Sequence, residues 1–117
     1  MPRGRGADDR ARYEVQLRES AHEDLERIYE YIAETHPLNA ARYVDRIHRA
    51  LGSLSLLPRA HREPPGLGGL GVRQVIVGAH RALFFVREDL RRVDVVRIVH
   101  VRQDAESYEA DLREALG

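Results

Sequence analysis

Three polar residues that could do chemistry follow an apolar, strand-like segment near the end of the chain. His100, Arg102 and Asp104 lie two residues apart in the segment VVRIVHVRQD, residues 95–104. Alternate side chains of an extended strand point to the same face, so these three are expected to project together. The cluster has three interpretations: a catalytic site, a binding patch, or ordinary polar residues at a sheet edge.

The composition limits the chemistry open to these residues. The chain has 117 residues, no cysteine and 43% hydrophobic residues, which predicts one packed domain without disulfides or thiolate metal sites. All 19 basic residues are arginine, so no mechanism can use a lysine as base or nucleophile. The histidines are scattered without a paired i, i+4 spacing, so we expect no metal site and no cofactor.

The start of the chain and its charge distribution suggest where the protein acts. The opening residues MPRGRGADDRAR lack an apolar stretch, and no apolar run approaches the length of a membrane span. We therefore expect a cytoplasmic protein without membrane contact, with a flexible N-terminal extension at residues 1–11 and a single domain at residues 12–117. Residues 72–102 hold seven arginines and three acids, which predicts a surface for an anionic partner unless the acidic tail neutralises it.

Apolar residues recur every three or four positions in two segments, which predicts two amphipathic helices. Ser20 is expected to cap the first helix, with Glu23 completing a capping box, and Pro37 to end it. Asn39 is expected to cap the second helix, which ends before Pro58. Because only HPLN separates the two segments, they are expected to form an antiparallel hairpin. The apolar stripes are Ala21, Leu25, Ile28 and Ile32, then Ala40, Val44, Ile47, Leu51 and Leu54.

Four further segments have the pattern of strands. One alternates apolar and polar residues over 13–17, and three follow a loop rich in proline and glycine, at residues 72–77, 80–87 and 93–101. Short connections make the last three an antiparallel meander. A final helix is expected at 105–116, capped by Asp104, with Arg102 pairing with Asp104 or with an acid of that helix. The order β-α-α-β-β-β-α gives an α+β fold with helices packed on a mainly antiparallel sheet.

The last two strands are apolar on both faces, so both faces of the sheet must be covered. The helical hairpin is expected to cover one face. The final helix offers few apolar residues for the other face, so the sequence predicts an exposed apolar groove there that awaits a partner.

Taken in order, these segments resemble the RelE/ParE superfamily of toxins from bacterial type II toxin–antitoxin modules. The opening strand and first helix of that superfamily resemble YEVQLRESAHEDLERIYEYIAETHP, where Ala21, Asp24 and Leu25 form an A-x-x-D-L frame. Its second helix resembles NAARYVDRIHRALGSLSLLP, and its later strands resemble GVRQVIVGAHRALFFV and VVRIVHVRQD. The resemblance runs from about Tyr13 to Tyr108 and implies a RelE/ParE-like fold in a small toxin held inactive by a cognate antitoxin.

The RelE-like branch of this superfamily implies an endoribonuclease that cleaves messenger RNA on the ribosome. Such cleavage needs a base, an acid and positive charge beside the phosphorane. Arg102 and Tyr108 match the C-terminal arginine and tyrosine of that branch, and His80 and His100 could serve as acid and base near neutral pH. The alternative for each histidine is a residue at a strand end that makes one hydrogen bond.

The resemblance is closer to the ParE-like branch, which implies a toxin that binds and inhibits DNA gyrase without catalysis. Lysine is absent, and the strand position of the RelE-like arginine falls on Val75 or Ile76. His80 stands where the ParE-like branch commonly has a tyrosine, which leaves the target in doubt. A non-toxic relic that binds only its antitoxin is a third hypothesis. Contact with the target or antitoxin is expected at Arg73, Arg81, His80, His100 and Arg102.

Overall fold

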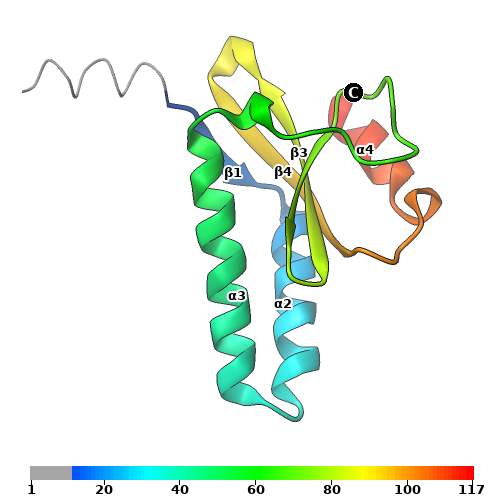
Figure 1. Cartoon of the computed structure of the whole chain (residues 1–117). Helices are drawn as coiled ribbons and strands as arrows, with labels where there is room; N and C mark the ends of the chain where they lie inside the picture. Colours follow the sequence, from blue (N-terminus) through cyan, green and yellow to red (C-terminus); the bar gives the residue numbers. More distant parts are fainter. Residues whose placement is uncertain (1–11) are drawn as a thin grey trace, which may run out of the picture.

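The computed structural model describes residues 12–117, so the extension expected at residues 1–11 lies outside the described residues. Its elements follow the order β-α-α-β-β-β-α, and the α+β class is confirmed (Figure 1). The helices and strands are β1 (Glu14–Leu17), α2 (Glu19–Ala33), α3 (Pro37–Gly52), β2 (Arg73–Val77), β3 (His80–Arg87), β4 (Arg92–His100) and α4 (Glu109–Leu116).

One four-stranded sheet has the strand order β1-β4-β3-β2. The β2–β3 and β3–β4 pairs are antiparallel, which confirms the predicted meander, whereas β1 runs parallel to β4. The β3–β4 register shifts beside Leu83, which pairs with Arg97 while Phe84 pairs with Val95. Val96 is therefore the extra residue of a bulge in β4. Beyond the bulge the pairing continues, shifted by one residue, and brings His80 opposite His100.

The hairpin of α2 and α3 covers one face of the sheet and extends beyond it (Figure 1). Its apolar stripes form a buried core with residues of β2, β3 and β4, chiefly Ala21, Leu25, Ile47, Leu51, Leu54, Val77, Ala82, Phe84, Val93, Val95 and Ile98. Burial of apolar side chains is the main force that holds the hairpin on the sheet. No helix within residues 12–117 has the length and apolar character needed to cross a membrane.

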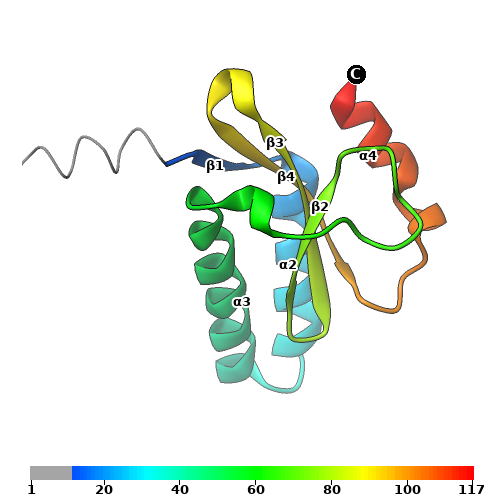
Figure 2. The ribbon, with the colours of Figure 1, turned by 45° about the horizontal axis from the view of Figure 1, so that its top comes forward.

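The second face of the sheet is covered, so the predicted exposed groove is wrong. The loop before β2 runs beside α4 (Figure 2) and adds Leu67 to the apolar residues over this face. With Tyr108 and Leu112 it buries Leu83 and Phe85 almost completely. Leu67 was missed because it stands alone in a glycine- and proline-rich segment, where no periodicity marks it.

The predicted side-chain caps are also wrong. Helix α2 begins at Glu19, and the hydroxyl of Ser20 donates instead to the carbonyl oxygen of Val96 at 2.6 Å. Helix α3 begins at Pro37 rather than after Asn39, because the fixed φ of proline suits the first helical position. Asp104 makes no side-chain capping bond to the 3₁₀ turn Ala105–Ser107 that precedes α4. Among the described residues, Arg102 forms no ion pair with Asp104 or with an acid of α4.

Candidate functional site

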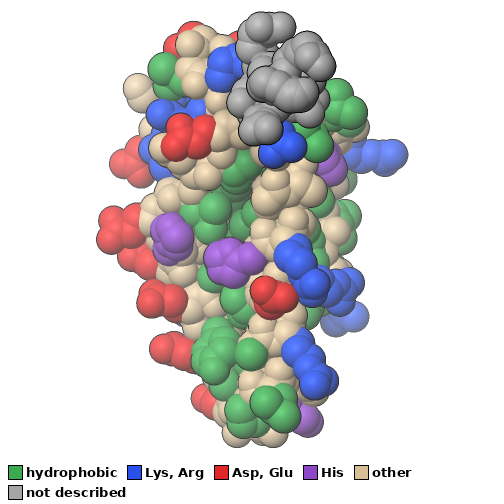
Figure 3. Space-filling model, turned by 90° about the vertical axis from the view of Figure 1, so that its left-hand side faces the viewer, with side chains coloured by type: hydrophobic (Ala, Val, Ile, Leu, Met, Phe, Trp, Pro, Cys, Tyr) green, Lys and Arg blue, Asp and Glu red, His purple; other side chains and the backbone are tan. Residues whose placement is uncertain are grey.

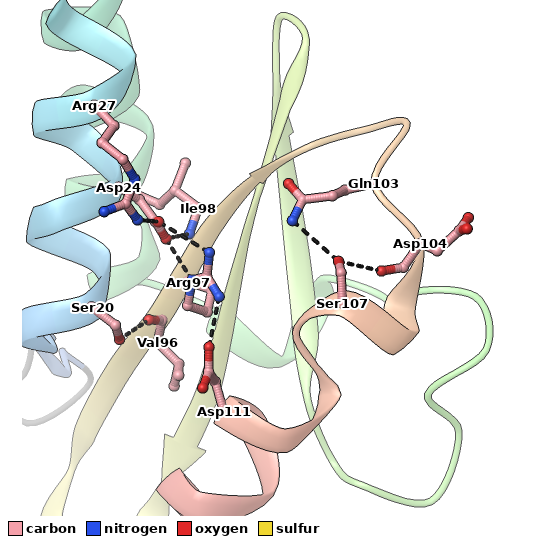
Figure 4. Close-up of polar contacts among 10 residues, drawn as sticks. All are labelled: Ser20, Asp24, Arg27, Val96, Arg97, Ile98, Gln103, Asp104, Ser107 and Asp111. Atoms are coloured by element: carbon pink, nitrogen blue, oxygen red, sulfur yellow. Dashed lines mark hydrogen bonds and ion pairs between the residues drawn. The ribbon is translucent and has the colours of Figure 1, made fainter.

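A buried carboxylate ties α2 to the half of β4 that leads to His100. Asp24 is 4% exposed, and its oxygens accept four hydrogen bonds (Figure 4). Two come from the Nε and Nη2 atoms of Arg97 at 2.8 and 3.1 Å, one from Arg27 at 2.6 Å, and one from the backbone N–H of Ile98 at 2.7 Å. The forked contact with Arg97 has the geometry of a strong, orientation-specific pair.

Asp24 also bonds to a backbone group at the edge of β4 where no strand lies beside it. Strand β1 ends at Leu17, opposite Val95, so from Val96 onward the edge of β4 has no strand beside it. Unpaired backbone groups are costly when they are buried. The hydroxyl of Ser20 satisfies the carbonyl of Val96, and Asp24 satisfies the N–H of Ile98 (Figure 4). The first two turns of α2 therefore complete the sheet edge through their side chains.

Arg97 extends the connection to α4. Its Nη1 atom donates to Asp111 at 2.7 Å, while its other nitrogens hold Asp24 (Figure 4). The hydrogen bond with Asp24 raises the pKa of Arg97 and outweighs the opposing effect of burial. One guanidinium thus joins α2, β4 and α4, and fixes the strand that ends at the polar cluster.

Two histidines meet at the paired ends of β3 and β4. The ring centroids of His80 and His100 are 5.4 Å apart with a T-shaped orientation. The backbone N–H of Arg102 donates to Nδ1 of His100 at 3.1 Å, so a neutral His100 holds its proton on Nε2. Nδ1 of His80 lies 2.6 Å from the hydroxyl of Tyr43, which reaches this point from α3.

The Tyr43 hydroxyl also fixes the tight turn between β2 and β3. It accepts a hydrogen bond from the N–H of Ala79 at 3.0 Å and lies 3.1 Å from the carbonyl oxygen of Val77. The phenol has one proton, so when that proton goes to Val77 the short contact with His80 requires a proton on Nδ1 of His80. Tyr43 therefore links the turn, the histidine pair and the helical hairpin.

Burial lowers the pKa of His80 below its ordinary value of 6.5, and the neighbouring His100 lowers it further, while the more distant charge of Asp24 opposes both effects. The folded state thus favours a neutral imidazole at this position. A neutral histidine beside a phenol can donate or accept a hydrogen bond, but it contributes no positive charge to an anionic partner.

This shift predicts a pH dependence of stability. Because the unfolded chain protonates His80 more readily than the folded chain, the free energy of unfolding should fall as pH drops below about 6.5. Denaturant titrations at several pH values on wild type and on His80→Gln isolate this contribution. The decline in wild type should be steeper than in the variant between pH 6.5 and the lower pKa of the folded state. Equal slopes would show that His80 titrates alike in both states.

The two predicted strand arginines are engaged within the domain. Arg73 donates from Nη1 to the carbonyl oxygens of Arg59 and His61, and so holds the long loop against β2. Arg81 donates to Oε1 of Gln74 at 2.6 Å and to the carbonyl oxygen of Val101 at 2.9 Å. Both guanidiniums have structural contacts that a partner would have to share or replace.

Arg102 and Tyr108 lie in different environments. Arg102 is exposed at the end of β4, and its side chain makes no hydrogen bond or ion pair within residues 12–117. The Tyr108 side chain is 3% exposed and packs against Leu67, Leu83 and Leu112. The pair therefore does not form a joint surface site: Arg102 is available to a partner, whereas Tyr108 belongs to the second core.

The sequence interpretation missed the roles of Ser20, Asp24 and Tyr43. A signal for Asp24 existed, because an acidic residue on the buried side of α2, between Ala21 and Leu25, must find a partner. The partner could not be found from the sequence, since the end of β1 opposite Val95 is a tertiary feature. No group of three His, Cys, Asp or Glu residues within the described chain is arranged to hold a metal ion.

Comparison with solved structures places this geometry among known toxins. The chain is similar to the chromosomal ParDE toxin–antitoxin system from P. aeruginosa, with 21% identity and a TM-score of 0.68 over 79% of this chain and 99% of that chain. It is similar to the E. coli toxin RelE in the free state, with 13% identity and a TM-score of 0.66 over 91% and 99%. The toxin–antitoxin complex RelBE2 from Mycobacterium tuberculosis matches with 22% identity and a TM-score of 0.53 over 76% and 98%. These likenesses show the RelE/ParE fold.

A match to a family model assigns the chain to the ParE branch rather than the RelE branch. Comparison with curated proteins gives no match. The model of the ParE toxin of type II toxin–antitoxin systems, from parDE modules, matches residues 15–105, which include the hairpin, the sheet except Glu14, and the polar cluster. The chain therefore belongs to the ParE toxin family of type II toxin–antitoxin systems.

Proposed function

We propose that this toxin acts by binding and inhibiting DNA gyrase, without a catalytic step of its own, and that a cognate antitoxin neutralises it. The observation that carries the proposal is the match to the ParE family across residues 15–105. That match places the chain in the branch for which the sequence resemblance implies a gyrase-binding toxin.

The arrangement of the polar residues supports binding over RNA cleavage. The phenol of Tyr108 is buried in the second core, away from solvent-exposed Arg102. The strand position of the RelE-like arginine is apolar in either alignment, at Val75 or Ile76. His80 favours its neutral form, so it adds no positive charge to stabilise a phosphorane.

The proposed target surface is the end of the sheet beyond the Gly78 turn. His100 and Arg102 are exposed there, His80 is half-buried beside them, and Ile76 is 55% exposed on β2. A guanidinium with no ion pair among the described residues and an exposed aliphatic side chain at the same end of the sheet have the composition of a protein-binding patch. The side chain of Arg81 would act by shaping this surface through its bond to Val101, whereas Arg73 lies at the other end of β2.

We also propose an antitoxin partner, on the basis of the family match and of two similar structures. The similar structures from P. aeruginosa and Mycobacterium tuberculosis are described as toxin–antitoxin assemblies. We expect this chain to form such an assembly with a cognate protein that blocks its toxic surface.

Induced expression in a bacterium tests the target. DNA synthesis should fall before protein synthesis in pulse-labelled cells, and Arg102→Ala should weaken this effect, because Arg102 is the exposed cation of the patch. Arg12→Ala is the matched control and should leave toxicity unchanged. Arg12 is exposed just before β1, whose start lies opposite Arg92, at the other end of β4 from His100.

The opposite order would favour the alternative. If protein synthesis falls first and messages are cut on the ribosome, the chain is a RelE-like endoribonuclease. If neither synthesis falls while antitoxin binding remains tight, the toxic function is absent.

A further inference from the structure

An open groove runs along the outer face of the helical hairpin, between α2 and α3 and away from the polar cluster. Its volume is about 750 Å³. The groove is lined by Leu25 and Val44, by Tyr29, which is 41% exposed, and by the imidazoles of His22 and His48. An apolar floor between two parallel rims is the shape that accepts helices from a partner.

The groove is lined on α3 by Val44 and His48, and beyond this lining the outer sides of the two helices have opposite charge. On α2, glutamates recur with spacings of four, three and four residues, at Glu19, Glu23, Glu26 and Glu30. On α3, arginines recur with spacings of four and three, at Arg42, Arg46 and Arg49. These spacings place each set in one stripe along its helix. Figure 3 shows most acidic side chains along one edge of this face and arginine side chains along the other.

These charges are largely unpaired within the domain. Among the described residues, the four glutamates and Arg42 and Arg46 have no ion pair. Arg49 pairs with Asp45 at 3.3 Å, and both side chains are exposed, so this contact holds Arg49 weakly. The face therefore presents an acidic stripe on α2 and a basic stripe on α3 that can each pair with opposite charges of a partner.

A surface with both stripes is complementary to itself, and we infer that two copies of this chain pair through their hairpins around a two-fold axis. The axis must run along the groove, parallel to the helices. Rotation about that axis places α2 of one copy on α3 of the other, so unlike stripes meet. An axis across the groove would place α2 on α2 and oppose like charges, which is unfavourable.

The positions of the charged residues along the helices fit this axis. A rotation about an axis parallel to the helices leaves the position of each residue along that axis unchanged. Counting about 1.5 Å per residue from the hairpin tip places Glu26 and Glu30 near the level of Arg42. The same count places Glu19 and Glu23 near the level of Arg49. His22 and His48 line the same groove, which agrees with this alignment of the two helices. Every acidic position on one copy thus finds an arginine at its own height on the other.

The resulting dimer would be a four-helix bundle. Tyr29 and Val44 of both copies would leave water, and burial of apolar area would supply most of the stability. The ion pairs at the rim would select this pairing over others and would weaken at high salt. The inference stands apart from gyrase inhibition, because it concerns a different face of the molecule.

Sedimentation velocity on the full chain tests the inference through complementary charge reversals. Glu26→Arg with Glu30→Arg should be monomeric alone, because its α2 would repel Arg42 of a second copy. Arg42→Glu should be monomeric alone for the mirror reason. An equimolar mixture of the two variants should restore the dimer, since each reversed stripe then meets its opposite. Arg62→Glu makes the same charge change outside the hairpin and should dimerise like wild type.

Recovery in the mixture also shows that both variants are folded. A wild-type chain that stays monomeric over a wide concentration range at low salt would overturn the inference, even if the groove binds a helix of another protein. A dimer that survives both reversals would overturn it as well. Neither result depends on whether the chain inhibits gyrase.

Discussion

Replacing Asp24 with alanine is expected to lower the free energy of unfolding by about 3–5 kcal/mol, the typical effect of breaking a buried ion pair by removing one partner. The substitution leaves the 14% exposed side chain of Arg97 without its forked acceptor. It also leaves the backbone N–H of Ile98 without a partner at the edge of β4. The measurement is equilibrium denaturation in urea, followed by far-ultraviolet circular dichroism.

Asp111→Ala is the matched control for this prediction. It removes the other carboxylate that binds Arg97, at a similar distance of 2.7 Å, but Asp111 is 49% exposed. An exposed ion pair contributes about 0–1 kcal/mol, so this variant should remain close to wild type. Equal losses for the two variants would contradict the view that Asp24 completes the sheet edge and Asp111 only extends it.

Replacing Gly78 with alanine should lower the free energy of unfolding by about 2–4 kcal/mol, from a left-handed backbone and a steric overlap acting together. Gly78 has φ of +58°, and a Cβ placed there would lie 2.8 Å from Cε1 and 2.9 Å from the hydroxyl of Tyr43. The ring cannot move aside freely, because its hydroxyl holds Ala79 and contacts His80. Thermal and urea denaturation measure the loss.

Gly71→Ala separates the two causes. Gly71 also has a positive φ, +79°, but a Cβ there would meet no atom within 4 Å. It should therefore show the backbone penalty alone, about 1 kcal/mol. If Gly71→Ala is as harmful as Gly78→Ala, the contact with Tyr43 has no special effect on stability.

The order of elements could be predicted from local patterns, because the helical hairpin and the meander are each recognisable from a few residues. Two apolar stripes joined by HPLN leave little choice but an antiparallel hairpin, and Gly78 with its neighbours marks a tight turn. The predicted caps at Ser20 and Asn39 were wrong for different reasons. Ser20 bonds to β4, which is a tertiary contact without a local signature, whereas Pro37 starts α3 earlier through its own fixed φ, which is a local effect.

The candidate site was predictable in its residues but not in its connections. His100 and Arg102 were marked by their place at the end of an apolar strand, and both lie at the end of β4. The contact of His80 with His100 depends on the bulge in β4, and the contact of His80 with Tyr43 depends on how α3 crosses the sheet. Neither feature has a local signature. The burial of Tyr108 likewise depends on Leu67, which lies 41 residues earlier in the chain.

We propose that this ParE-family chain disables gyrase by binding through the surface around Arg102. The most direct measurement adds the purified chain to DNA gyrase, ATP and relaxed plasmid, and follows supercoiling on a gel. Supercoiling should stop as the chain approaches saturation, and Arg102→Ala should need more protein for the same inhibition while Arg12→Ala matches wild type. Full supercoiling at every concentration of folded wild-type chain would contradict the claim.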